Sequence, residues 1–275
     1  MILVTGPTGN VGRHVVSQLT AAGLEVRALV RDPARAPEGV EAVKGDLFAP
    51  ETLEPALEGV ESVFLIWPGF AAATAAPVVK LVAAHARRIV YLSADVEDLA
   101  DDERPTLFHQ EIERLIRHTG LSWTFLRPGG FAANTLGWAE QIRQGVVRWP
   151  YGEARRALIH EKDIAAVAVH VLTSAGHGGA RYVLSGPEQL TQAEQARIIG
   201  EVVGREVRWE EMPPDEAREW LLGSWGEATF VDGALATWRS FVDAPERVTD
   251  TVPRLLGRPA LTFREWAGDH AGDFR

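Results

Sequence analysis

The chain has 275 residues, and 46% of them are hydrophobic, which is enough for a sizeable core. Its formal net charge of −10 disfavours nucleic acid as a partner, because phosphate backbones require a basic surface. It contains no cysteine, which excludes disulfides, thiolate metal sites and a cysteine nucleophile, and we expect no metal site. Met1 leads directly into an apolar segment, and the uncharged run at residues 62–79 is interrupted by two prolines. We therefore expect no signal peptide, no membrane span and a cytoplasmic location.

The opening residues 1–16 predict a strand, a glycine-rich turn and a helix. Residues 2–5 are apolar or β-branched, three glycines follow at intervals of three, and apolar residues then repeat at helical spacing. Gly6 allows a tight exit from the strand, Gly9 leaves room for a phosphate, and Gly12 lets the helix pack close to the sheet. Since the N–H groups of the first helical turn then face an anion, this stretch predicts a dinucleotide-binding turn.

The rest of the first half alternates strands with helices. This alternation is typical of a parallel sheet with right-handed crossovers, so we expect an α/β fold with a Rossmann-type parallel sheet and helices on both faces. Residues 95–103 carry six carboxylates and are expected to form a solvated loop. The expected strands are residues 24–30, 40–44, 62–67, 88–93 and 122–127, and the expected helices are residues 51–57, 76–86 and 106–118.

Charged residues follow the second expected strand, where a dinucleotide fold meets the adenosine ribose. An acidic side chain there accepts a hydrogen bond from a free 2′-hydroxyl, whereas an arginine accommodates a 2′-phosphate. Arg31 comes first and Arg35 lies close behind, which favours NADP(H) over NAD(H). Asp32 adjoins Arg31, and the alternative is a solvated charge cluster before a proline. Asp46, in the turn after the third strand, is expected near the adenine edge.

The pattern changes after Gly145, and we expect a smaller α+β lobe at the C-terminus. Asp163 is expected to cap a helix over residues 164–172, and Thr191 a helix that ends at residue 203. Further short strands are expected at residues 157–160, 181–185 and 206–210, and residues 213–275 are predicted to be helical. The expected domains are a dinucleotide-binding domain over residues 1–150, with interleaved segments at about 155–185, and a substrate lobe over residues 186–275.

Several motifs together resemble the NmrA-like atypical short-chain dehydrogenases, particularly their NAD(P)H-dependent quinone oxidoreductase branch: GPTGNVG, VRD, GDL, VYLSA, FHQEIERLIRHTGLSWTFLRPGGFAAN and HEKDIAAVAVHVL. The resemblance covers residues 1 to about 205 and touches LTFREWAGDH, where the family often has a tryptophan-containing helix. It implies an NAD(P)H-dependent oxidoreductase. The expected cofactor contacts are Gly6, Thr8, Gly9, Asn10, Val11, Gly12, Arg31, Asp46, Leu47, Trp67, Pro68, Gly69, Ser93, Pro128 and Phe131.

The chain departs from the classical members of this superfamily at the catalytic residues. Those enzymes use a Tyr-x-x-x-Lys pair as general acid and its partner, and none of the three tyrosines here is followed four residues later by lysine. Ser93 occupies the place of the family's serine after the fifth strand, and His109 begins a His-x-x-x-Glu pattern with Glu113. Ser93 and His109 are the candidate catalytic residues. The alternatives are a hydroxyl bonded to the backbone and a half-exposed histidine at a helix start.

The absence of a Tyr-x-x-x-Lys pair restricts the reactions that the site can catalyse. Reduction of an ordinary ketone creates a localised alkoxide that needs a proton in the transition state, whereas a quinone spreads the incoming charge over an aromatic ring. We therefore predict hydride transfer to an aromatic quinone-type substrate, one variant being a polyketide quinone whose hydroquinone then reacts with oxygen and ends hydroxylated. The alternatives are a non-catalytic NADP(H)-binding redox sensor that signals to a protein partner and, less favoured, a sugar epimerase or ordinary ketoreductase.

Aromatic side chains that follow strand ends, Trp67 among them, are expected to wall a flat substrate pocket. The nicotinamide is expected over Gly6 and Pro128, with the substrate between it and the C-terminal lobe. The oligomeric state stays open, with a homodimer as one alternative. The expected substrate contacts are Phe70, His109, Phe131, Asn134 and Trp138, and the tryptophans expected in the core of the lobe are Trp209, Trp220, Trp225 and Trp238.

Overall fold

The computed structural model describes residues 1–98 and 107–275, and these divide into two compact units. Unit 1 comprises Met1–Pro128, Glu161–Leu184 and Thr251–Arg258, and unit 2 comprises Gly129–His160, Ser185–Asp250 and Pro259–Arg275. This division differs from the expected boundary at residue 150. Residues 129–150 lie in unit 2 because residues 146–149 pair there with residues 208–211.

Unit 1 is built on a seven-stranded sheet in which all neighbouring strands are parallel, in the order β3-β2-β1-β4-β5-β6-β9. The direction of strand progression reverses between β1 and β4, and in open α/β sheets ligands bind outside the carboxyl ends of the strands at such a point. The predicted Rossmann-type fold is confirmed. The strands are β1 (Ile2–Thr5), β2 (Val26–Val30), β3 (Glu41–Lys44), β4 (Ser62–Ile66), β5 (Arg88–Leu92), β6 (Ser122–Pro128) and β9 (Ala180–Leu184).

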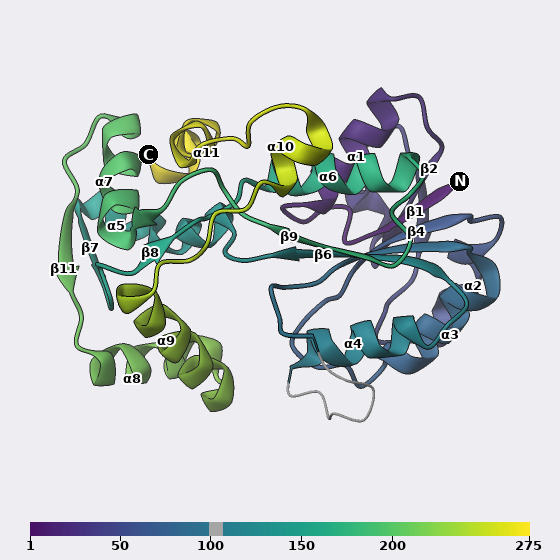
Figure 1. The fold of residues 1–275 in the computed structure, drawn as a ribbon, viewed down its shortest axis with the longest axis horizontal. Coiled ribbons are helices and arrows are strands. Elements are labelled where there is room, and N and C mark those ends of the chain that lie inside the picture. The colour runs from purple at the N-terminus through teal and green to yellow at the C-terminus, as the bar shows by residue number, and fades with distance from the viewer. Residues whose placement is uncertain (99–106) are drawn as a thin grey trace. The chain divides into compact units, whose positions relative to one another are not determined.

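Helices cover both faces of this sheet (Figure 1). One face carries α1 (Gly12–Ala21), α6 (Glu161–Thr173) and α10 (Thr251–Leu256), and the other carries α2 (Glu54–Leu57), α3 (Ala75–His85) and α4 (Phe108–Arg117). Short 3-10 turns follow β2 and β3 as η1 (Pro33–Arg35) and η2 (Pro50–Thr52). The expected start of the helix at residue 106, and residues 99–103 of the acidic stretch, lie outside the described residues.

The predicted cap of α6 is wrong. The helix begins at Glu161, so Asp163 lies inside its first turn instead of at its N-cap. The Asp163 side chain is fully buried and forms an ion pair with Arg258 at 2.7 Å. Glu161 is also buried, and its carboxylate lies 3.7 Å from Arg13. Both carboxylates still lie near the positive end of the helix dipole, and each also forms a tertiary ion pair.

Unit 2 contains two small two-stranded sheets. β7 (Val146–Trp149) pairs in parallel with β11 (Arg208–Glu211), and β8 (Arg155–Arg156) pairs antiparallel with β10 (Leu190–Thr191). The strand expected at residues 157–160 is wrong, because β8 ends before it and Ile159 forms an isolated bridge with Phe131. The helices are η3 (Ala132–Trp138), α5 (Ala139–Gln144), α7 (Gln192–Val203), α8 (Pro214–Trp225), α9 (Ala228–Asp243), α11 (Phe263–Asp269) and η4 (Ala271–Phe274).

The predicted cap of α7 is confirmed. The Thr191 hydroxyl accepts a hydrogen bond from the Glu194 N–H at 3.0 Å, and the Glu194 carboxylate accepts one from the Thr191 N–H at 2.8 Å. This reciprocal capping box satisfies two N–H groups that would otherwise lack a partner. Thr191 lies directly before the helix that it caps, which explains why the sequence pattern alone could predict the cap.

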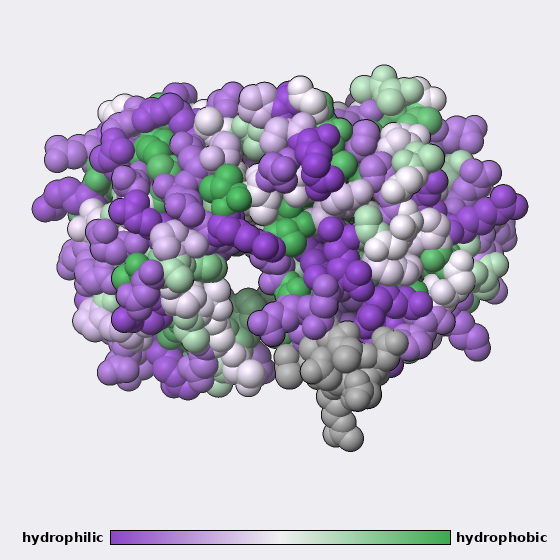
Figure 2. All heavy atoms as spheres, viewed as in Figure 1, coloured by the Kyte–Doolittle hydropathy of each residue, from purple (hydrophilic) through white to green (hydrophobic). Residues whose placement is uncertain are grey.

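The tryptophans of unit 2 divide between core and surface. Trp209 and Trp238 are partly buried and pack against the core, as expected. Trp220 and Trp225 are instead 47% and 39% exposed, because only two residues of α8 are buried. The face drawn in Figure 2 is mostly hydrophilic, with apolar side chains scattered among charged ones. Within residues 1–98 and 107–275, no helix is long and apolar enough to cross a membrane.

Candidate functional site

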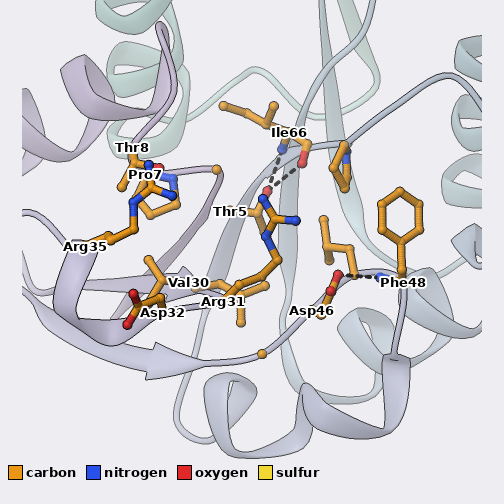
Figure 3. Close-up of a pocket in the computed structure, with 15 residues that line it drawn as sticks. Thr5, Pro7, Thr8, Val30, Arg31, Asp32, Arg35, Asp46, Phe48 and Ile66 are labelled. Atoms are coloured by element: carbon orange, nitrogen blue, oxygen red, sulfur yellow. Dashed lines mark hydrogen bonds between the residues drawn. The ribbon is translucent and has the colours of Figure 1, made fainter.

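A pocket of about 480 Å³ lies at the carboxyl ends of β1, β2, β3 and β4 in unit 1 (Figure 3). The topology of the sheet brings these ends together at the reversal of strand order. Of the expected cofactor residues, those that line it are Gly6, Thr8, Arg31, Asp46, Leu47 and Pro68. The lining residues that were not among the expected contacts are Thr5, Pro7, Leu29, Val30, Asp32, Arg35, Gly45, Phe48 and Ile66.

The glycine-rich turn after β1 borders this pocket. Gly6 has a φ of +58°, a left-handed conformation that favours glycine. A Cβ on Gly9 would meet only the Gly6 carbonyl oxygen, at 3.4 Å, so the space beside Gly9 is open to a ligand. A Cβ on Gly12 would overlap that same oxygen. The turn's own backbone, rather than packing on the sheet as we expected, therefore requires glycine at position 12.

The N-terminus of α1 is left free to interact with an anion. Val11, at the N-cap, has no polar side chain, and the first turn contains no acidic residue. The N–H groups that no side chain caps, together with the helix dipole, then give this end a partial positive charge. Together with the open space beside Gly9, this arrangement fits the pyrophosphate of a dinucleotide.

Two arginines line the pocket beyond β2. Arg31 and Arg35 are both exposed, and in Figure 3 the Arg35 side chain points toward Pro7 and Thr8. The carboxylate of Asp32 accepts a hydrogen bond from the Ala34 N–H at 3.1 Å and so caps η1. This acidic side chain is thereby engaged with the backbone, and the guanidinium groups are the positive charges presented by this segment.

Hydrogen bonds hold the loops around the pocket. The Thr5 hydroxyl donates to the Ile66 carbonyl at 2.9 Å and accepts from the Ile66 N–H at 2.7 Å, which ties the ends of β1 and β4 together. The Asp46 carboxylate accepts from the Phe48 N–H at 2.9 Å, so it holds the turn after β3 while it lines the pocket. Trp67 is buried in the core of unit 1, where its indole N–H donates to the Ala71 carbonyl at 2.8 Å.

The candidate catalytic residues lie where β5 and α4 meet in the same unit. The Tyr91 hydroxyl lies 2.7 Å from Nδ1 of His109. The Ser93 hydroxyl donates to Oε1 of Glu113 at 2.6 Å, so the expected alternative of a bond to the backbone does not describe this hydroxyl. Tyr91 was not predicted as part of the site.

Arg127 completes the buried network around Ser93. Its guanidinium donates to both oxygens of Glu113, at 2.9 and 2.5 Å, and to Asp98 at 2.8 Å. The side chains of Arg127 and Glu113 are only 6% and 5% exposed, whereas Asp98 is 62% exposed. The buried guanidinium and carboxylate therefore neutralise each other, and sequence reasoning also missed Arg127.

Burial decides the protonation of this cluster. It lowers the pKa of His109 to about 4, so the imidazole is neutral at neutral pH. Burial and the charge of Glu113 raise the pKa of Tyr91 well above its usual value. Burial works to lower the pKa of Arg127, but hydrogen bonds and charges of Glu113 and Asp98 raise it. His109 therefore offers no imidazolium as a proton donor at neutral pH.

The spacing of these residues in the sequence could have indicated the Tyr91–His109 and Ser93–Glu113 pairs. Tyr91 and Ser93 are two residues apart, so they lie on one face of a strand about 6.6 Å apart. His109 and Glu113 are four residues apart, so they lie on one face of a helix about 6 Å apart. Because the two separations are nearly equal, both strand residues can contact a helix residue at the same time, Tyr91 with His109 and Ser93 with Glu113.

The remaining expected residues are distributed over both units. Pro128 ends β6 in unit 1, and Phe70, also in unit 1, is 66% exposed and packs edge-to-face on Phe108. In unit 2, Asn134 is exposed, and Trp138, only 4% exposed, belongs to the hydrophobic core. The expected contacts of these residues with cofactor or substrate stay predictions. Among the described residues there is no group of three or more histidine, aspartate or glutamate side chains that could hold a metal ion.

The fold and the pocket define an NAD(P)-binding protein: a parallel sheet with a strand-order reversal, a glycine-rich turn, an uncapped helix N-terminus and arginines beyond the second strand. Residues 6–175 match a family model described as NAD(P)H-binding, and the chain belongs to this family. The predicted resemblance to NmrA-like atypical short-chain dehydrogenases is confirmed.

Two relatives that match along the whole chain are named reductases. The chain is 41% identical to a (4-alkanoyl-5-oxo-2,5-dihydrofuran-3-yl)methyl phosphate reductase of Streptomyces griseus and 36% identical to an NAD(P)H azoreductase of Xenophilus azovorans, covering 100% of this chain and 99% of each relative. An NADPH-dependent quinone oxidoreductase of Escherichia coli, solved with NADPH, is similar in structure with a TM-score of 0.79 and 25% identity, covering 98% of this chain and 99% of that one. The chain is an NAD(P)H-dependent oxidoreductase.

Proposed function

We propose that this enzyme transfers hydride from NADP(H) to a conjugated, quinone-type acceptor that spreads the incoming charge over several atoms. The observation that carries the proposal is the hydrogen bonding and burial of the candidate catalytic pair. The Ser93 hydroxyl hydrogen is directed at Glu113, 2.6 Å away, and His109 is neutral. Such a site can donate hydrogen bonds but lacks the strong acid that a localised alkoxide requires.

When bound, NADP(H) supplies a hydride, that is, two electrons with a hydrogen nucleus. The residues of this chain then have three tasks. The α1 N-terminus and Gly9 accommodate the pyrophosphate, Arg31 and Arg35 neutralise the 2′-phosphate, and neutral His109 donates a hydrogen bond to the oxygen that gains charge. The acceptor gains the hydride and one proton from solvent, which converts a quinone to a hydroquinone.

The relatives support this acceptor class. Their names describe an azo bond, a quinone and a ring carbon–carbon double bond conjugated to two carbonyl groups. A phosphorylated unsaturated lactone of the last kind is the second candidate substrate, because the relative named for it is 41% identical over the whole chain. A polyketide quinone whose hydroquinone then reacts with oxygen belongs to the same class and stays a prediction.

A panel of acceptors tests the function. With NADPH and the full chain, we expect turnover of a naphthoquinone, an azo dye or an acyl-butenolide phosphate, and turnover of cyclohexanone slower by about 10²-fold or more because its alkoxide finds no proton donor. Deuterium on the transferred position of NADPH should slow the reaction where hydride transfer limits the rate. Efficient reduction of cyclohexanone would contradict the mechanism, and no turnover with any acceptor despite tight NADPH binding would favour a redox sensor.

The preference for NADP(H) can be tested at Arg31. Replacement of Arg31 with alanine removes a charge-assisted contact to the 2′-phosphate and should weaken NADPH binding by about 1.5–3 kcal/mol. NADH lacks this phosphate, so its affinity should change little and serves as the internal control. Fluorescence titration with both cofactors measures the difference. Equal losses for NADPH and NADH, or a wild-type preference for NADH, would remove the argument.

A further inference from the structure

Tyr91 is a buried residue in contact with the candidate catalytic histidine. It lies in β5 in the middle of the sheet, opposite Leu65 of β4 on one side and Phe125 of β6 on the other, and it is fully buried. Its ring packs edge-to-face on Phe125 with 6.3 Å between ring centroids. Two neighbouring strands and a packed ring thus fix the position of the Tyr91 hydroxyl, 2.7 Å from Nδ1 of His109.

The direction of this hydrogen bond decides the tautomer of the imidazole. If Tyr91 donates to Nδ1, the hydrogen of neutral His109 must lie on Nε2. If Nδ1 donates instead, the hydroxyl hydrogen needs another acceptor, and within the described part of the chain His109 is the only hydrogen-bond partner of the Tyr91 hydroxyl. A buried donor without an acceptor is unfavourable, so donation from Tyr91 to Nδ1 is the satisfied arrangement.

We propose that Tyr91 is a positioning residue whose hydroxyl, by donating to Nδ1 of His109, holds the imidazole as the tautomer that presents an Nε2–H donor to the acceptor. This inference rests on the proposed function for the role of the Nε2–H group. Its structural part, the tautomer, can be tested without any turnover.

Tyr91 does not act as the proton source. Loss of its proton would leave a phenolate buried in the sheet near Glu113, and burial together with that charge raises the pKa of Tyr91. Because the imidazole is already neutral, with a pKa lowered to about 4, its Nε2–H group stabilises charge by hydrogen bonding and keeps its hydrogen. The proton that completes the product then comes from solvent, which suits an acceptor whose charge is delocalised.

Tyr182 and His177 provide a matched control in the same unit. The Tyr182 hydroxyl lies 2.7 Å from Nδ1 of His177, the same distance as in the Tyr91 pair. His177 lies just before β9 and so near the amino-terminal edge of the sheet, opposite the edge that carries the pocket. Tyr182→Phe therefore removes the same kind of hydrogen bond away from the candidate site.

The test combines nitrogen NMR with kinetics on the full chain. Histidine-labelled protein, with His109 assigned by comparison with His109→Gln, should show hydrogen on Nε2 and an unprotonated, hydrogen-bonded Nδ1. In Tyr91→Phe both nitrogens should shift toward the averaged values of two exchanging tautomers, and kcat for a naphthoquinone should fall about 3- to 10-fold, as expected for one lost hydrogen bond, with little change in KM for NADPH. Tyr182→Phe should change the signals of His177 and leave kcat unchanged.

Glutamine at position 109 separates positioning from general structural damage, because its amide carries N–H donors in any state. Tyr91→Phe should therefore have no further effect on kcat in the His109→Gln background. A wild-type His109 with hydrogen on Nδ1, or an equal kinetic loss from Tyr91→Phe in both backgrounds, would overturn the proposal. If wild-type protein reduces no acceptor, the proposed function fails while the tautomer measurement still decides the structural part.

Discussion

Replacement of Glu113 with alanine is expected to lower the free energy of unfolding by about 3–5 kcal/mol, because it leaves a buried guanidinium without its main partner. Glu113 is 5% exposed, accepts from the Ser93 hydroxyl and binds Arg127 through both carboxylate oxygens. Arg127 would then retain the Val96 carbonyl, which carries no full charge, and Asp98, which is largely exposed and screened by solvent. Urea unfolding of the variant and the wild type measures the loss.

Two further variants control this result. Glu111, on the same helix, pairs with Arg114, and both side chains are about one third exposed. Glu111→Ala should therefore cost less than about 1 kcal/mol. Combining Glu113→Ala with Arg127→Met should cost less than the sum of the single changes, since no unpaired charge remains. A loss for Glu113→Ala no larger than that for Glu111→Ala would contradict the assigned role of the buried pair.

Gly12→Ala is expected to disrupt the turn after β1, with a loss of about 3 kcal/mol in stability and of about 10²-fold or more in NADPH affinity. The added Cβ would overlap the carbonyl oxygen of Gly6 and lie 2.8 Å from its carbonyl carbon. Both atoms belong to the backbone, so the clash cannot be relieved by a side-chain rotation. Thermal unfolding and titration of the tryptophan fluorescence with NADPH measure the two effects.

Gly9→Ala is the matched variant in the same turn. Its Cβ would make an ordinary contact of 3.4 Å with the Gly6 oxygen, and we expect nearly normal stability. The methyl group would nevertheless occupy the open space assigned to the pyrophosphate, so NADPH affinity should fall. Normal binding by Gly9→Ala would mean that this glycine serves only the turn, and normal stability of Gly12→Ala would contradict the steric argument.

Local patterns were sufficient for much of unit 1. The sequence patterns at residues 2–16 predicted β1, its turn and α1. They were sufficient because the apolar run, the spaced glycines and the helical repeat each involve residues close together in sequence. Alternation of strands and helices then restricted the sheet to parallel strands with right-handed crossovers. The Thr191 cap was predicted for the same reason, since it lies immediately before the helix and its partner Glu194 is only three residues away.

Long-range pairing accounts for what the sequence patterns missed. Residues 129–150 were assigned to the wrong unit because β7 pairs with β11, about 60 residues later along the chain. Asp163 was interpreted as a cap because its partner, Arg258, lies far away in sequence and no local pattern indicates that ion pair. Trp220 and Trp225 were expected in the core from hydrophobicity alone, although burial depends on which face of α8 is covered.

The amino-acid pattern was enough to establish the dinucleotide-binding turn, the fold class and the absence of a Tyr-x-x-x-Lys pair, because these depend on residue types at short, fixed spacings. Only the tertiary structure decided the state of the candidate catalytic residues. Ser93 and His109 were visible in the sequence, but their partners Glu113 and Tyr91 are assigned by the docking of α4 on β5. That docking also supplies the burial that keeps the imidazole neutral, and burial is a property of the packed fold that no short motif carries.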